Sequence, residues 1–583
     1  MERNESASPS SVLFLDRVGE VVLDLNADGF SWKPHDSDHA ELNSRSCLGI
    51  NLNAMIEAEI RFSEIYAIEF IGWGLIHGFT GSVGGFISAV ARLEQMYRFV
   101  VHGYYKQGAS HTPGPWTLSE YMFGHKNLQT CQNWAEQLNT FLKMEIGRPK
   151  SLLVFVHPLC GRGKGCKNWE TVAPLFSRAK VEMKVHVTQR AGHAYDIIKS
   201  STDKELSAFD GIVAVGGDGL FNEILNGLLS SRHKAPYPPA PADSSYAGNI
   251  DRDQQHRNHS FNGRPSHEND DHEPLLSTQE ANGVDISNKH KPGSCNADQD
   301  PVLSFPNVCT TGVRDPITSA LQIILGHKTP LDIAQVVRWK TRPSSVDVPS
   351  VRYAASFAGY GFYGDVIKES EKYRWMGPAR YDYAGTKVFL KHRSFEAEVA
   401  FLESKSVEPT TRSGGPQPAQ LSSERPKKMV CRKNCTVCNE TTNSNHPSAN
   451  GAIKSSRIHS EGSRWLRSKG RFLSIGGAVI SCRNERAPDG LVADAHLADG
   501  FLHLILIKDC PRPSYLWHLT QLTRKGSDPL NFEFVEHHKT SAFTFISTHD
   551  ESFWNLDGEL LQACQVSVQS IMKPACFDST KVN

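Results

Sequence analysis

The 583-residue sequence has no excess of charge of either sign, because 63 lysines and arginines balance 63 aspartates and glutamates. A formal charge of zero and a pI near 7.4 argue against a nucleic-acid-binding protein whose whole surface is basic. Any charged partner must be bound by a local group of residues, and no nucleic acid is expected among the partners.

Cysteine, a secretory leader and long apolar runs are also scarce or missing. The 13 cysteines are too few for a disulfide scaffold, and the first residues lack the basic and then apolar pattern of a leader. One run without formal charge, residues 70–91, is long enough to cross a bilayer, but it contains six glycines and His77. A glycine-rich surface loop or a membrane-touching loop is favoured over a span, and free thiols in the cytoplasm are expected.

The first 148 residues are predicted to form strands followed by one helix. Runs of β-branched and aromatic residues precede residues 128–142, where Cys131, Trp134, Leu138 and Leu142 recur at helical spacing. Strands closed by a helix with an inward tryptophan resemble a pleckstrin-homology domain. An unrelated small α+β domain is an equally weighted alternative.

Two stretches rich in Ser, Asn, Pro and His, residues 232–300 and 403–463, lack apolar periodicity and are predicted to be disordered insertions. Around the first, residues 150–334 alternate strand and helix signals, with buried-type strands at 152–156, 181–188 and 209–217. The alternation predicts a parallel α/β domain.

Residues 335–575, which contain the second insertion, show successive strands with turn signals, so a mainly antiparallel β domain is expected. The predicted fold class is therefore α/β plus all-β, preceded by the small N-terminal domain.

The strongest local motif is Gly216-Gly217-Asp218-Gly219 between an apolar strand and an amphipathic helix. Glycines at a strand-to-helix turn let backbone N–H groups approach a phosphate, which the helix N-terminus also favours. An aspartate there would repel the phosphate unless it handles a proton or a metal. Asp218 is the candidate general base; an ordinary glycine turn with Asp as helix N-cap is the alternative.

A second glycine-rich loop, HPLCGRGKG at residues 157–165, follows the first α/β strand and carries two cations. It fails the P-loop pattern because Pro158 replaces the first glycine and no Ser or Thr follows Lys164. It also fails the dinucleotide pattern because Cys166 stands at the last glycine position. Alone it is a weak signal for a polyphosphate.

These two loops, with TQRAGHA at 188–194, resemble the diacylglycerol-kinase catalytic family of lipid kinases. Two later segments match the family too, ESEKYRWMG at 369–377 and NLDGE at 555–559. The resemblance implies ATP and Mg²⁺ as cofactors, Asp218 as the catalytic residue, and Gly216, Gly217, Asp218 and Gly219 as the substrate-binding turn. The ATP-binding residues that it implies are His157, Pro158, Leu159, Thr188, Gln189, Arg190, Ala191, Gly192, Glu223, Arg374, Arg380, Asp557, Gly558 and Glu559.

Within this family the chain most resembles the ceramide kinases, those of plants in particular, through GYGFYGD (359–365), LADGFLHLILIK (497–508) and a C-x₃-C-x₂-C cluster. Sphingosine kinases have a second acid two residues after the position of Asp365, where this chain has Ile367. An apolar residue there suits the neutral amide of ceramide, although it does not exclude diacylglycerol. The resemblance implies a role in sphingolipid signalling and programmed cell death, and Ca²⁺ as an activator.

The cluster Cys431, Cys435 and Cys438 has two interpretations. Three thiols within eight residues could bind Zn²⁺, but a structural tetrahedral site needs a fourth ligand, for which His446 and His459 are candidates. Redox-sensitive or packing thiols are the alternative.

One departure from the family puts activity in doubt, because no Pro-Ala-Gly-Ser/Thr motif follows the first insertion between Pro301 and Gly312. A chain lacking a short segment, or one that binds lipid but phosphorylates it poorly, is the alternative to an active kinase. Residues 403–470 contain 12 basic and only 5 acidic residues. This excess of positive charge favours peripheral contact with an anionic internal membrane, where the ceramide lies.

Overall fold

The computed structural model describes three folded regions. The described residues are 10–35, 58–78, 92–106, 114–233, 236–241, 315–339, 349–404, 431, 435, 437–438, 464–484, 486–548 and 551–572. Most of both predicted insertions, the segment between Pro301 and Gly312, and the candidates His446 and His459 lie outside these residues.

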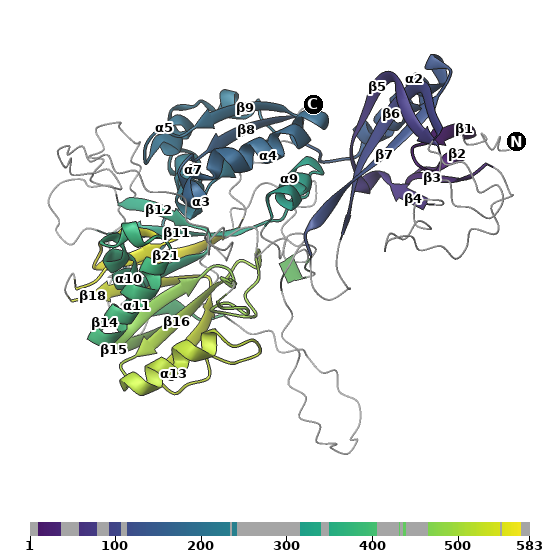
Figure 1. Cartoon of the computed structure of the whole chain (residues 1–583). Coiled ribbons are helices and arrows are strands. Elements are labelled where there is room, and N and C mark those ends of the chain that lie inside the picture. Colours follow the sequence, from purple (N-terminus) through teal and green to yellow (C-terminus); the bar gives the residue numbers. More distant parts are fainter. Residues whose placement is uncertain are drawn as a thin grey trace, which may run out of the picture.

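The N-terminal region is an antiparallel sheet closed by one helix, which stands to one side of the rest of the chain (Figure 1). Its strand order is β4-β3-β2-β1-β7-β6-β5. The elements are β1 (Ser10–Leu15), β2 (Gly19–Leu25), β3 (Gly29–Pro34), β4 (Ala58–Arg61), the 3₁₀ turn η2 (Phe62–Glu64), β5 (Ile65–Gly78), β6 (Arg92–Lys106), β7 (Trp116–His125) and α2 (Leu128–Met144).

Helix α2 confirms the predicted periodicity. The side chain of Asn127 caps its N-terminus by accepting a hydrogen bond from the Thr130 N–H at 3.2 Å. The four residues at helical spacing are all buried, Trp134 being 3% exposed, and they pack against the sheet. The strands-then-helix order with an inward tryptophan is therefore present.

The described part of the 70–91 run is a strand and not a loop. Its first nine residues continue β5, which pairs with β6 in antiparallel register, for example Trp73 with Tyr97. Alternation along a strand leaves Trp73 and Leu75 about half exposed while Ile76 is buried. The loop prediction was wrong here because aromatic and β-branched residues pair across strands in spite of intervening glycines.

The middle region is the predicted parallel α/β unit. Strands β8 (Ser151–Val156), β9 (Glu182–Val187) and β10 (Gly211–Val215) are parallel in the order β10-β8-β9. The central strand β8 is buried on both faces, as its continuous apolar sequence requires. Its helices are α3 (Cys160–Gly163), α4 (Gly165–Arg178), α5 (His193–Ser200), α6 (Asp203–Leu206), α7 (Asp218–Arg232) and α9 (Pro316–Ile324).

The C-terminal region is the predicted antiparallel domain, an 11-stranded sheet with order β12-β11-β21-β18-β14-β15-β13-β19-β20, to which β16 and β17 add beside β15. Its strands are β11 (Asp332–Arg338), β12 (Ser350–Ala354), β13 (Phe357–Gly361), β14 (Phe395–Leu402), β15 (Trp465–Ala478), β16 (Leu502–Lys508), β17 (Val535–Thr540), β18 (Ala542–Ser547), β19 (Trp554–Leu556), β20 (Glu559–Leu561) and β21 (Gln565–Met572). Its helices are α10 (Phe362–Glu371), the 3₁₀ turn η4 (Arg374–Met376), α11 (Ala379–Lys391) and α13 (Arg512–Leu522).

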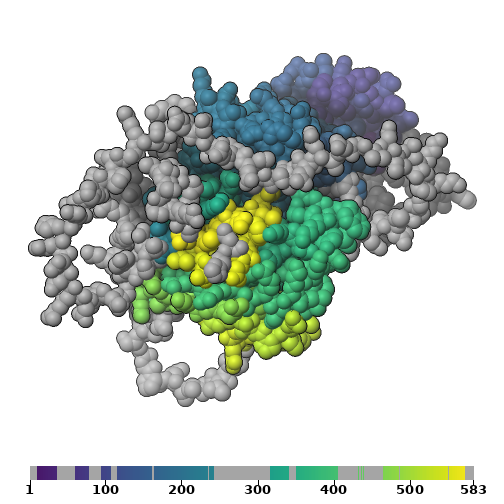
Figure 2. Space-filling model, turned by 90° about the vertical axis from the view of Figure 1, so that its left-hand side faces the viewer, coloured from purple at the N-terminus to yellow at the C-terminus, as the bar shows by residue number. Residues whose placement is uncertain are grey.

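The α/β and C-terminal regions share a junction. Leu225 and Leu229 of α7 pack with Ile333, Tyr353 and Ala355 of the C-terminal sheet in one buried cluster. Strand β21 pairs with β11, so the last strand lies beside the first strand of its domain. In Figure 2 the last residues, in yellow, lie below the α/β region in blue.

Candidate active site

Three loops meet where the parallel strands end. They follow β8, β9 and β10, whose carboxyl ends lie at one edge because the strands are parallel. The His157 N–H donates to the Val215 carbonyl at 2.9 Å, and the Thr188 N–H donates to the Val156 carbonyl at 2.9 Å. The sequence motifs at 157–165, 188–194 and 216–219 are therefore neighbours.

The glycine turn places Asp218 at the start of α7. Gly217 is the N-cap, and Asp218 is the first helical residue and is half-buried. A Cβ on Gly216 would lie 2.6 Å from Cδ2 of Leu220 and 3.3 Å from Cβ of His157, so only glycine lets this turn pack against both. Such a helix N-terminus favours an anion.

His157 contributes a buried polar atom beside that turn. Its Nδ1 is buried and has no hydrogen-bond partner among the described residues. A buried nitrogen without a partner is costly, so the loop after β8 fits an additional polar group such as a nucleotide. Leu159, two residues further, is 77% exposed.

Glu223 joins the second loop to α7. Its carboxylate accepts the N–H of Gly192 at 2.8 Å and the N–H of Ala194 at 3.2 Å. Gly192 adopts φ 78° before α5, a conformation that glycine tolerates best. Because both oxygens are bonded to backbone, Glu223 is placed to hold the loop.

Among the other polar residues of the second loop, one is buried and another is exposed to solvent. Thr188 is buried, whereas the Arg190 side chain is 63% exposed and forms an ion pair with Asp196 at 2.5 Å. The Gln189 N–H donates to Nδ1 of His193 at 3.1 Å. Arg190 is thus free to exchange a surface partner for a phosphate at small cost.

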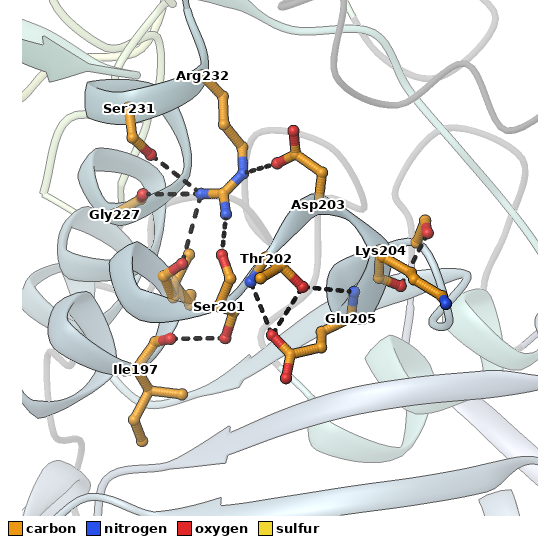
Figure 3. Close-up of polar contacts among 11 residues, drawn as sticks. Ile197, Ser201, Thr202, Asp203, Lys204, Glu205, Gly227, Ser231 and Arg232 are labelled. Carbon is orange, nitrogen blue, oxygen red and sulfur yellow. Dashed lines mark hydrogen bonds and ion pairs between the residues drawn. The ribbon is translucent and has the colours of Figure 1, made fainter.

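The far end of α7 is fixed by Arg232 (Figure 3). Its Nε donates to Asp203 at 2.7 Å, and its Nη atoms donate to the carbonyls of Ile198 and Ser201. Arg232, the first residue of the insertion defined by composition, is the last residue of α7. The helix that carries Asp218 is thereby tied to α5 and α6.

Replacing Arg232 with alanine should lower the free energy of unfolding by about 2 kcal/mol, because it removes a largely buried charge-assisted hydrogen-bond network. Thermal unfolding would measure the loss. Arg467→Ala is the matched control, since its pair with Glu398 is exposed and is worth about 0–1 kcal/mol. Equal midpoints for both variants would contradict the role of Arg232.

The C-terminal motif reaches the glycine turn across the junction. A Cβ on Gly219 would lie 3.6 Å from Oε1 of Glu559. Burial, and then the carboxylates of Glu223 and Glu371, raise the pKa of Glu559, while Arg374 and Arg352 oppose the shift. Acidic and basic groups from four separate segments therefore converge around Glu559, next to the glycine turn.

Asp557 has a different position from Glu559. It accepts the N–H groups of Ala355, Ser356 and Phe357 at 2.6, 3.1 and 2.9 Å, and also the Ser356 hydroxyl. With Gly558 it forms a two-residue hairpin turn, at φ 50° and 96°, between β19 and β20. Asp557 therefore fixes the turn that presents Glu559.

The two predicted phosphate-binding arginines meet on one carboxylate. Nε of Arg374 donates to Glu371 at 2.6 Å, and Nη1 of Arg380 lies 3.5 Å from the other oxygen of Glu371. Glu371 ends α10, and its charge also acts on Glu559. The arginines are therefore brought to the same side of the site.

A cavity of about 200 Å³ lies beside α10. Asp365 lines it, accepts the Ser552 hydroxyl at 2.6 Å and has a pKa raised by burial. Asp365 was not predicted as a site residue, although it follows Gly364 in the GYGFYGD motif, where a Cβ would meet the backbone of Phe553. The apolar lining is Phe362, Val388, Phe389, Leu473, Tyr515 and Phe553.

The three clustered cysteines converge, and they do so on a histidine that the sequence analysis missed. Cys431, Cys435, Cys438 and His496 have ligand atoms within 4.8 Å of one another. This cluster belongs to the C-terminal domain and not to the strand-end loops.

Within the described residues, no helix combines the length and apolarity that crossing a membrane requires.

Comparison with known proteins covers both regions of the site. Residues 151–240 match the diacylglycerol kinase catalytic domain family, and residues 420–573 match the ceramide kinase C-terminal domain family. The ceramide kinase of Oryza sativa subsp. japonica is 55% identical over 96% of this chain and 96% of its own length. The ceramide kinase of Arabidopsis thaliana is 52% identical over 96% and 94%, and that of Homo sapiens 31% over 87% and 86%. With motifs, fold and relatives in agreement, the chain belongs to the ceramide kinase family.

Proposed function

We propose that this chain transfers the γ-phosphate of ATP to the primary hydroxyl of ceramide. The observation that carries the proposal is Asp218 at the N-terminus of α7, inside a turn of glycines whose Gly219 lies next to Glu559. The name of the relatives supplies the substrate.

In the proposed reaction Asp218 accepts the proton of the hydroxyl as its oxygen bonds to the γ-phosphorus. The bond from that phosphorus to the β-phosphate oxygen breaks, so ADP leaves and ceramide 1-phosphate forms. The glycine N–H groups and the helix N-terminus face the negative charge, and Arg374 and Arg380 lie on the same side. Mg²⁺ bound with ATP would neutralise phosphate charge. Glu559 is the carboxylate placed to hold it, because Glu223 is bonded to backbone and Glu371 to two arginines.

The remaining ATP contacts are proposed on the same basis. His157, Pro158 and Leu159 follow β8, and residues 188–192 follow β9. The unpartnered Nδ1 of His157 and the exposed Arg190 support these positions. For Glu223 and Asp557 the bonds to backbone support a role in holding ATP-binding loops, with Gly558 in the turn.

Asp365 supports the choice of a neutral lipid. It is half-buried in a cavity lined by both apolar and charged residues, among them the cations Lys368, Lys372, Lys391 and Arg393, and Ile367 on the same helix is half-buried and apolar. The four cations disfavour a protonated amine, and the Asp365 carboxylate already accepts the Ser552 hydroxyl. Diacylglycerol and sphingosine remain the alternative substrates within the family.

Transfer of labelled phosphate from ATP to ceramide, sphingosine and diacylglycerol, each in mixed micelles, tests the proposal. Ceramide should be labelled fastest. Faster labelling of sphingosine or diacylglycerol would identify that lipid, and not ceramide, as the substrate. If none of the three lipids is labelled, the chain binds lipid without phosphorylating it.

The missing Pro-Ala-Gly-Ser/Thr motif provides a specific test of whether this chain binds lipid without phosphorylating it. We propose inserting a family segment with this motif after Pro306 and repeating the assay. Activity gained by the insertion would identify this chain as an impaired form, whereas equal rates would show that the motif is dispensable here.

We also propose the domain boundaries, the cellular location, the activating ion and the biological role of this kinase. The N-terminal 148 residues would act as a pleckstrin-homology-like domain, followed by kinase domains at 150–334 and 335–575. The protein would work in the cytoplasm on the surface of internal membranes, with Ca²⁺ as activator and a role in sphingolipid signalling and programmed cell death. The exposed Trp73 and Leu75 of β5 support contact with a lipid surface.

A further inference from the structure

Two chain segments far apart in the sequence form a closed four-ligand cluster in the C-terminal domain. Cys431, Cys435 and Cys438 come from the segment between β14 and β15, and His496 comes from the loop between β15 and β16. All four ligand atoms lie within 4.8 Å of one another. Three sulfurs and one imidazole nitrogen are the donor set of a structural zinc site.

Two distances within the cluster are close to the edges of a tetrahedral zinc site. With Zn–S near 2.3 Å and Zn–N near 2.1 Å, tetrahedral edges are about 3.8 Å between sulfurs and about 3.6 Å from sulfur to nitrogen. Sγ of Cys431 lies 3.6 Å from Sγ of Cys438, and Sγ of Cys435 lies 3.2 Å from Nδ1 of His496. A disulfide would need a separation of about 2.05 Å.

Backbone groups next to His496 are directed at the sulfurs. The Leu497 N–H donates to Sγ of Cys431 at 3.3 Å, and the Ala498 N–H donates to Sγ of Cys438 at 3.4 Å. Such bonds stabilise thiolates and orient them as metal ligands. Residues 496–498 thus supply one ligand and two outer hydrogen bonds.

Burial indicates that the ion would be structural. Cys431 and Cys438 are each 4% exposed and pack with the core of the sheet, which Cys435 also contacts. Four protein ligands leave no position for substrate or water, in contrast to a catalytic zinc. Oxygen-seeking ions such as Ca²⁺ and Mg²⁺ do not suit this donor set.

We propose that Cys431, Cys435, Cys438 and His496 bind one structural Zn²⁺ that fastens the long β14–β15 segment to the sheet. Binding releases the three thiol protons and leaves the imidazole neutral. The Leu497 carbonyl accepts the N–H of Asp332 at 2.7 Å, so the fastened loop also contacts the first residue of β11. The ion therefore stabilises the C-terminal domain and takes no part in phosphate transfer.

Metal analysis of the purified full-length chain tests the assignment. About one zinc per chain is expected, and Cys435→Ser and His496→Ala should each reduce it at least several-fold. His446→Ala and His459→Ala, which change the two candidates chosen from sequence, should retain zinc, as should Cys510→Ser, a half-buried cysteine outside the cluster. Full zinc content in His496→Ala, or loss in His446→Ala or His459→Ala, would overturn the ligand set.

Two further measurements remain informative if a variant folds poorly. His496→Cys restores a four-sulfur set and should retain zinc and the wild-type melting temperature, which His496→Ala should lower. Chelation of the wild-type protein should lower its melting temperature, and added Zn²⁺ should restore it. The proposal would be overturned if the wild-type protein contained no zinc. A count of titratable thiols below its 13 cysteines would then indicate a disulfide.

Discussion

Replacing Asp218 with asparagine should reduce the turnover of ceramide by about 10²–10⁴-fold, the usual contribution of a general base. The amide keeps the size of the side chain and its place at the first position of α7, but it cannot accept the proton. The KM for ATP should change little, because the glycine turn and the loops after β8 and β9 are untouched. Initial rates with labelled ATP measure both quantities.

Controls separate lost chemistry from lost structure. The thermal midpoint of Asp218→Asn should equal that of the unmodified chain. Asp24→Asn, a half-buried aspartate on β2 of the N-terminal region, should retain full activity. Turnover by Asp218→Asn equal to that of the parent would remove Asp218 from the catalytic role.

Replacing Asp557 with alanine should lower the free energy of unfolding by about 3–5 kcal/mol. The change leaves three backbone N–H groups and one hydroxyl buried without their common acceptor. It also forces alanine into a left-handed conformation at φ 50°, which adds about 1 kcal/mol within that range. Thermal or urea unfolding of the purified protein would show the loss.

A graded series tests this explanation for Asp557. Ser356→Ala removes only the hydroxyl contact and should cost about 1 kcal/mol. Asp557→Asn, which tolerates the left-handed conformation, should fall between the two. If Asp557→Ala unfolds like the parent while its KM for ATP rises, Asp557 contacts the nucleotide and does not brace the turn.

The motifs predicted from the sequence were found together for a simple reason. The loops after β8 and β9 and the Gly216–Gly219 turn all follow parallel strands, and parallel strands place their carboxyl ends at one edge. The convergence of Glu559, Arg374 and Arg380 on the same side followed from family resemblance alone. No local pattern shows that β20 faces α7, because that contact depends on packing between the two domains.

Three features lay beyond the sequence analysis. His496 was missed as the fourth member of the cysteine cluster because ligands close in space need not be close in sequence, and His446 and His459 were chosen for proximity along the chain. The hydrogen bonds of Asp557 and Glu223 to backbone were missed because an acidic side chain in a motif gives no sign of its partner. Strand β5 was missed beyond Phe70 because glycines concealed its alternation.

The sequence by itself determined the order of folded regions, the parallel and antiparallel sheets, and the glycine turn with its aspartate, because periodicity and turn chemistry are local. Only the tertiary structure decided which acidic residue faces the turn and which braces a loop, and which histidine joins the cysteines. Those distinctions depend on side chains separated by tens to hundreds of residues, and chain folding alone brings them within hydrogen-bonding distance.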